Sequence, residues 1–223
     1  MKLKDKLSIL QAIYDIYDRL FNATPHACQK FCSSCCTVNV TMTSLEGMYI
    51  LHHIPLEHKH SLYGTIKSCS SPKRYQPKLT LNGFAESCMA GIDIPDEEND
   101  PSWGKCPLLL ERSCTIYDYR PMACRIMMSK SICDEHGCAD MDELTITLNN
   151  IFLQYAEHID EKGFFGNLTD ILLFLDHEEN GLRQDNTRFS VIKNRAAPFL
   201  MIPPEHRKRI VPIIEEIQGK IWG

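Results

Sequence analysis

The sequence predicts a mostly α-helical protein with a few short strands, folded as a single compact domain over residues 1–223. Apolar residues recur at intervals of three and four along most of the chain, which is the helical pattern. A chain of this length buries roughly 70% of its unfolded surface without cross-links. The composition, 43% hydrophobic and 24% charged, is that of an ordinary globular protein, and no linker or repeat divides the chain.

The N-terminal part is expected to begin with an amphipathic helix over residues 3–21, because its apolar residues share one face. Residues 38–42 alternate in polarity, which predicts a short strand. Thr43 and Glu46 then have the spacing of a capping box, so a second helix should begin there and end near His53.

The rest of the chain is predicted to be helical except around its cysteines. A helix is expected around residues 57–68, and two short strands about a turn are expected within residues 106–117. The C-terminal part, residues 141–221, shows helical periodicity again. It should contain a long helix, a second one at about 167–177, and a last one opened by the prolines at 203–204.

The charge and the apolar pattern narrow the choice of partners. The net charge is -5, whereas nucleic-acid-binding domains are usually basic, so no nucleic-acid partner is expected. No stretch approaches the roughly 18 apolar residues of a membrane span, and Asp5, Asp15 and Asp18 interrupt the start where a signal peptide would be apolar. The sequence therefore predicts a cytoplasmic protein without a membrane partner.

Eleven cysteines stand out in a chain expected to occupy a reducing compartment, where clustered thiols more often bind metals than form disulfides. Cys69 and Cys88 are isolated and are interpreted as buried free thiols. The other nine, all candidate metal ligands, form two groups: Cys28, Cys32, Cys35 and Cys36, then Cys106, Cys114, Cys124, Cys133 and Cys138.

The spacing within the first group is typical of metal sites, since two or three intervening residues allow several sulfurs to approach one point. Cys35 and Cys36 are adjacent, and neighbouring side chains tend to point in different directions. They are therefore not expected to bind one metal equally. We expect both groups to contribute ligands to at least one common centre, around which the domain is organised.

Residues 28–47 and 106–125 also resemble the cysteine-cluster family named for its C-x-x-C-x-x-C-C element, which is described as zinc- or iron-chelating and to which flagellin lysine methylases are similar. The specific part is C-P…C-T-I-Y-D-Y-R-P-M-A-C-R. The resemblance implies a metal-binding core over about residues 28–138. It implies six ligands, which are Cys32, Cys35, Cys36, Cys106, Cys114 and Cys124.

The same resemblance makes Tyr117, Arg120 and Arg125 companions of the site and candidate cofactor-binding residues. Four thiolates on Zn²⁺ or on an oxidised four-iron cluster leave a net charge near -2. Nearby guanidinium groups and N–H donors would offset that charge.

The expected function is that of a metal-binding protein whose centre is a [4Fe-4S] cluster or, as the second choice, zinc. Its expected role is structural, electron transfer or metal handling, and a protein partner is a candidate. The alternative is a cluster-dependent enzyme for methyl or other group transfer, with S-adenosylmethionine as a candidate cosubstrate. Cys28, Cys32 and Cys35 have the spacing found in radical S-adenosylmethionine enzymes, although a barrel is not predicted. No nucleotide loop or hydrolytic motif identifies a cosubstrate, so enzyme status stays open.

Overall fold

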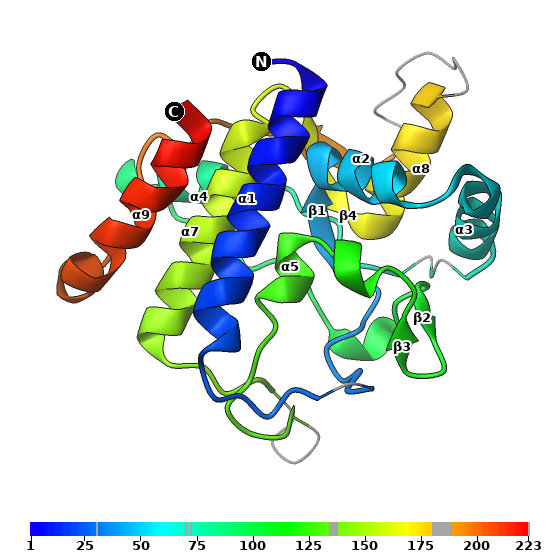
Figure 1. The fold of residues 1–223 in the computed structure, drawn as a ribbon, viewed down its shortest axis with the longest axis horizontal. Helices are drawn as coiled ribbons and strands as arrows, with labels where there is room; N and C mark the ends of the chain where they lie inside the picture. Colours follow the sequence, from blue (N-terminus) through cyan, green and yellow to red (C-terminus); the bar gives the residue numbers. More distant parts are fainter. Residues whose placement is uncertain (30, 70, 72, 134–137, 180–188, 223) are drawn as a thin grey trace.

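The computed structural model describes residues 1–223 except 30, 70, 72, 134–137, 180–188 and 223. Three helices form one side of the molecule: α1 (Leu3–Asn22), α7 (Glu143–Ile159) and α9 (Arg207–Trp222). They lie side by side, with α1 in contact with both of the others (Figure 1). The predicted first helix is thus present, and the fold is mostly helical as expected.

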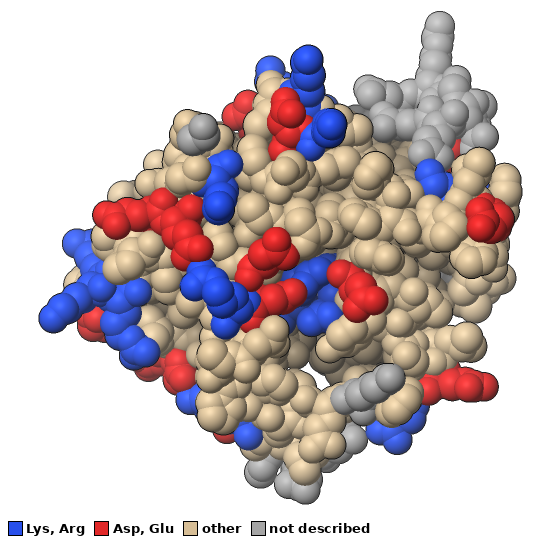
Figure 2. All heavy atoms as spheres, viewed as in Figure 1, with Lys and Arg blue, Asp and Glu red and all other residues tan. Residues whose placement is uncertain are grey.

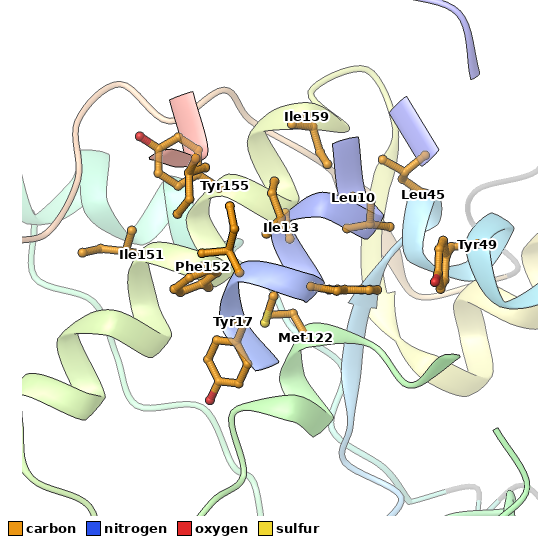
Figure 3. Packing of buried hydrophobic residues seen from close by; sticks show 14 of the residues in the cluster. Leu10, Ile13, Tyr17, Leu45, Tyr49, Met122, Ile151, Phe152, Tyr155 and Ile159 are labelled. Carbon is orange, nitrogen blue, oxygen red and sulfur yellow. The ribbon is translucent and has the colours of Figure 1, made fainter. Parts of the chain in front are cut away.

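The larger hydrophobic core lies where these helices meet (Figure 3). Leu10, Ile13 and Tyr17 of α1 are buried in this cluster together with Phe152 of α7, whose ring meets that of Tyr17 edge to face. Met122 comes from α5 (Met122–Arg125) and is fully buried in the same cluster. A short helix from the cysteine-rich part of the chain is therefore anchored in the main core.

The second half of the fold is built on a small antiparallel sheet. Its strands are β1 (Thr41–Thr43), β4 (Phe164–Asn167) and β5 (Val191–Lys193), in the order β1-β4-β5. Three helices surround a second core beside this sheet: α2 (Ser44–His53), α3 (Leu56–Cys69) and α8 (Leu168–Glu179). In Figure 1 they lie on the opposite side of the molecule from α9.

The predicted capping box is confirmed. The main-chain N–H of Glu46 donates to Thr43 Oγ1 over 3.2 Å, and the N–H of Thr43 donates to Glu46 Oε2 over 2.8 Å. The two residues thus satisfy each other's otherwise unpaired donors at the start of α2.

Other boundaries differ from the prediction. The strand expected at residues 38–42 is β1, over Thr41–Thr43, because Thr37 pairs with Lys105 outside the sheet. Two further strands, β4 and β5, were not predicted, since segments of four and three residues carry too little periodicity. The prediction also missed α4 (Leu81–Met89), although Thr80 caps it by accepting the N–H of Gly83.

The cysteine-rich part of the chain contains the two predicted short strands, β2 (Leu109–Leu110) and β3 (Ser113–Cys114), which pair antiparallel. Short 3₁₀ helices occur at η1 (Pro101–Trp103), η2 (Tyr117–Tyr119) and η3 (Pro204–His206). The first two flank the hairpin. Among the described residues, no helix is long and apolar enough to cross a membrane.

Candidate metal centre

The two cysteine groups meet through the backbone. The N–H of Cys106 donates to the carbonyl oxygen of Cys36 over 3.0 Å, and the N–H of Val38 donates to the carbonyl of Gly104 over 3.1 Å. An antiparallel bridge joins Thr37 to Lys105 between these bonds. The end of the first group and the beginning of the second therefore lie side by side, although they are far apart in the sequence.

Gly104 permits this close pairing. Its φ of 152° is a conformation that L side chains rarely adopt, and an added Cβ would lie 3.3 Å from Val38 Cγ1. A side chain at this position would therefore strain the backbone and press on the neighbouring segment.

The β2–β3 hairpin brings Cys114 near Cys106. Leu109 is the register partner of Cys114, and its N–H donates to the carbonyl of Cys106 over 3.1 Å. Both cysteines are half-buried and pack against the second hydrophobic core. Burial raises the pKa of Cys106 to about 11 and also raises the pKa of Cys114.

Cys124 belongs to the four-residue helix α5. Its N–H donates to the carbonyl of Pro121 over 2.9 Å, which closes the first turn. Burial raises the pKa of Cys124 well above its ordinary value, and the nearby thiols of Cys106, Cys114 and Cys35 raise it further. These sulfurs are thus close enough to act on one another electrostatically.

Cys35 and Cys36 differ in environment, as their adjacency suggests. The thiol of Cys35 donates a hydrogen bond to Cys36, which lowers the pKa of Cys36 and raises that of Cys35. Cys106, Cys124 and Cys114 also act on Cys36. We call the five linked thiols, Cys35, Cys36, Cys106, Cys114 and Cys124, the inner group.

Three further cysteines form an outer group: Cys28, Cys32 and Cys133. The segment before Cys28 is fixed by a hydrogen bond of 2.8 Å from the N–H of Ala27 to the carbonyl of Ser129. Burial raises the pKa of the half-buried Cys28, and Cys32, Cys133 and, from the inner group, Cys35 add to the effect. Cys32 is exposed.

The remaining cysteines, Cys69, Cys88 and Cys138, are exposed. The sequence placed Cys138 among the candidate ligands. It interpreted the first two as buried free thiols, and the expected burial was wrong, since both lie at the surface. None of the three appears in the inner or the outer group.

Arg120 is the cation that faces the inner group. A hydrogen bond raises the pKa of Cys35, and burial raises that of Cys114 and Cys124. The positive charge of Arg120 acts in the opposite direction on all three thiols, but its effect is smaller. Its guanidinium lies 4.0 Å from the ring centroid of Tyr117, and its Nη1 donates to the carbonyl of that residue over 2.9 Å. The exposed ring of Tyr117 therefore holds the guanidinium in place.

Arg125 has a different environment. Only 4% of this residue is exposed, and its Nη1 pairs with Asp18 Oδ2 of α1 over 2.6 Å. The same guanidinium donates to the carbonyls of Arg120 and Asp118, each over 3.0 Å, and lies 4.1 Å from the ring centroid of Tyr14. Arg125 thus joins the loop before α5 to helix α1.

Sequence reasoning did not single out Glu46 for the site beyond its role in the cap. Its second carboxylate oxygen, Oε1, accepts the N–H of Met122, the first residue of α5, over 2.7 Å. The capping box was the only local signal for this residue, since the bond to Met122 connects distant parts of the sequence.

The donor chemistry fits zinc or an iron–sulfur cluster, both of which bind thiolates. Figure 2 shows an opening between the chain that follows α5 and the loop that precedes β1, the two segments from which several of these cysteines come. Within the part of the chain that the structure describes, no three His, Cys, Asp or Glu side chains already converge closely enough to hold a metal ion. Ligation would therefore require the thiols to move towards the metal.

A comparison with protein families finds a match over residues 27–147, just over half of the 223 residues. The matching family is CxxCxxCC, described as a "putative zinc- or iron-chelating domain". The match includes all nine clustered cysteines, Tyr117 and both arginines. Neither a curated protein nor a solved structure was found to match the chain.

Proposed function

Because the chain belongs to the CxxCxxCC family of zinc- or iron-chelating domains, we propose that it holds a thiolate-ligated metal centre formed by the inner group. The ligands are Cys36, Cys106, Cys114 and Cys124. Cys35 supports the centre through its hydrogen bond to Cys36. Arg120 offsets part of the negative charge that four thiolates bring together.

One observation carries this proposal, the hydrogen bond between the N–H of Cys106 and the carbonyl of Cys36. It joins two cysteine groups that are separate in the sequence and places their thiols in one electrostatic environment. Buried thiols of ordinary core packing need neither several other thiols nor a cation near them.

We propose a [4Fe-4S] cluster as the occupant. The nine clustered cysteines lie in separate segments with uneven spacing, unlike the paired knuckles of a zinc ribbon, and this pattern favours a cluster. Such a cluster, when bound, supplies one-electron transfer. Zinc is the alternative, since tetrahedral sulfur ligation suits both.

The role that agrees best with this chemistry is structural, electron-transfer or metal-handling work in the cytoplasm. In the last two roles a protein partner would exchange electrons or metal with the site. The chain needs no further catalytic group for any of these roles.

The outer group supports a second candidate, a cluster-dependent enzyme. Cys32 and Cys133 both act electrostatically on Cys28, and a site with three protein ligands leaves one metal position open for a substrate or cosubstrate. Methyl or other group transfer is then the candidate reaction, with S-adenosylmethionine as a candidate cosubstrate.

Anaerobic purification followed by metal and sulfide analysis and a visible absorption spectrum tests the proposal. About four iron and four sulfide per chain are expected for the cluster, against zinc without sulfide for the alternative. Cys36→Ser and Cys106→Ser should each lose most of the metal. Cys88→Ser, which changes an exposed thiol outside both groups, is the control. Wild-type protein without bound metal would refute the proposal.

A further inference from the structure

Glu46 is a buried carboxylate with four hydrogen-bond donors around it. Only 3% of the residue is exposed. Its Oε2 accepts from the N–H of Thr43 over 2.8 Å and from Thr43 Oγ1 over 3.1 Å. Its Oε1 accepts from the N–H of Met122 over 2.7 Å and from the hydroxyl of Tyr14 over 3.0 Å. The carboxylate therefore connects α2 with both α1 and α5.

A capping box alone does not require this arrangement. The N3 carboxylate of a capping box needs only the N–H of the cap residue, and most such carboxylates lie at the surface. Burying a carboxylate is unfavourable unless hydrogen bonds replace its water. At Glu46 the second oxygen is aimed at the first N–H of α5, two residues before Cys124.

The helix that carries Cys124 needs external support. It contains four residues, Met122–Arg125, and helices of this length are unstable in isolation. Its N-terminus is held by Glu46, and the Met122 side chain is anchored in the core (Figure 3). Its last residue, Arg125, is held by Asp18 and by the ring of Tyr14.

Tyr14 contacts both Glu46 and Arg125, the residues that hold the two ends of α5. Its hydroxyl donates to Glu46, while the Arg125 guanidinium lies over its ring. Arg125 also donates to the carbonyl of Arg120, which links this unit to the cation beside the thiols. We call Tyr14, Glu46 and Arg125 the buried clamp.

We infer that the buried clamp positions Cys124 and Arg120 for the metal centre, so that residues of the helical core set the affinity of a site they do not touch. Glu46 and Arg125 are positioning residues, in contrast to Arg120, which acts through its charge. The inference rests on the proposed function. Residues that orient metal ligands without touching the metal typically contribute 10- to 100-fold to metal affinity.

Glu46→Gln tests the inference with a minimal change of shape. One carboxylate oxygen becomes an amide NH2 group, so the side chain can no longer accept both the N–H of Thr43 and the N–H of Met122. Metal affinity, measured by competition with a chelator at a temperature where the variant is folded, should fall about 10- to 100-fold. The thiolate-to-metal absorption of the loaded protein should change as well, because Cys124 is displaced.

Glu157→Gln is the matched control. Glu157 is also a buried carboxylate, 2% exposed, and accepts the N–H groups of Asn82 over 2.9 Å and Arg195 over 2.7 Å. Those partners belong to α4 and to the segment after β5 rather than to the cysteine segments. The control should lower the melting temperature while leaving the affinity and the spectrum of the folded protein unchanged.

The possible outcomes separate the inference from the proposed function. Wild-type protein without metal would remove the proposed function and, with it, the basis of the inference. Metal binding by wild type together with unchanged affinity in folded Glu46→Gln would overturn the inference alone, as would an equal loss in Glu157→Gln. If Glu46→Gln does not fold, Tyr14→Phe removes one donor to Glu46 and keeps the ring. It should weaken binding several-fold, and unchanged affinity would again overturn the inference.

Discussion

Arg120 and Arg125 flank Cys124 in the sequence, yet the guanidinium of Arg120 lies on the ring of Tyr117 and that of Arg125 lies on the ring of Tyr14. The first acts on the thiols of the inner group, whereas the second pairs with Asp18 of α1. Two residues that look equivalent in the sequence therefore contribute to the site in different ways.

Their replacements should affect a cluster differently. Arg120→Gln removes a cation near the thiols, and the reduced cluster carries one more negative charge, so the reduction potential should fall. A loss of about 1.4 kcal/mol corresponds to roughly 60 mV for one electron. Arg125→Gln should mainly lower metal content. Anaerobic redox titration after metal analysis measures both effects. Equal potentials in wild type and Arg120→Gln would contradict the assigned role of its charge.

The inner and outer groups should contribute differently to metal binding. If the inner group holds the centre, Cys106→Ser combined with Cys124→Ser should leave little bound metal, because two of four ligands are lost. Combined replacement of the outer group by serine should retain most of it. Elemental analysis of both variants after anaerobic purification decides the matter. Complete loss of metal in the outer-group variant would show that those thiols are ligands too.

Gly104→Ala should separate the paired segments. The φ of 152° and the approach to Val38 at 3.3 Å both disfavour a side chain there. We expect a loss of about 1 kcal/mol or more in the free energy of unfolding, together with reduced metal content. Gly64→Ala in α3 is the comparison, since nothing lies within 4 Å of its added Cβ. It should instead stabilise the protein by about 0.5–1 kcal/mol. Urea denaturation and metal analysis measure the two responses.

Asp142 gives a prediction of pH dependence. This residue caps α7, and hydrogen bonds from Lys130 and from the N–H of Thr145 lower its pKa to about 2. A carboxyl group whose pKa is lower in the folded state stabilises the protein above its unfolded pKa, and this contribution disappears as the pH falls towards 2. Asp142→Asn keeps a capping side chain and removes the charge. It should therefore be less stable than wild type at pH 7, with a difference that shrinks in acid. Denaturation at several pH values tests this, and a constant difference would contradict it.

Some features of the fold are readable from the sequence because their causes are local. The stripe of apolar residues in α1 and the exchange between Thr43 and Glu46 each lie within one helix or its cap. The hairpin of β2 and β3 also joins neighbouring residues. In each case the sequence pattern and the contact that it predicts lie within the same few residues.

The rest depends on contacts between distant segments. The spacing of the cysteines indicates a metal site, but it does not show that Cys36 pairs with Cys106. The bond from Met122 to Glu46 and the ion pair from Arg125 to Asp18 likewise arise from the packing of three helices. No local pattern could have separated the positioning role of Arg125 from the electrostatic role of Arg120.

The contacts of α1 with both α7 and α9 also bear on how the protein is made. Much of the apolar face of α1 is covered by these two helices, which come late in the sequence, so the main core can close only after they have been synthesised. Because Met122 belongs to that core, α5 should settle only at this stage. The set of ligands that includes Cys124 of α5 would then be complete only after the core has formed, so metal insertion should follow, rather than direct, the folding of the helices.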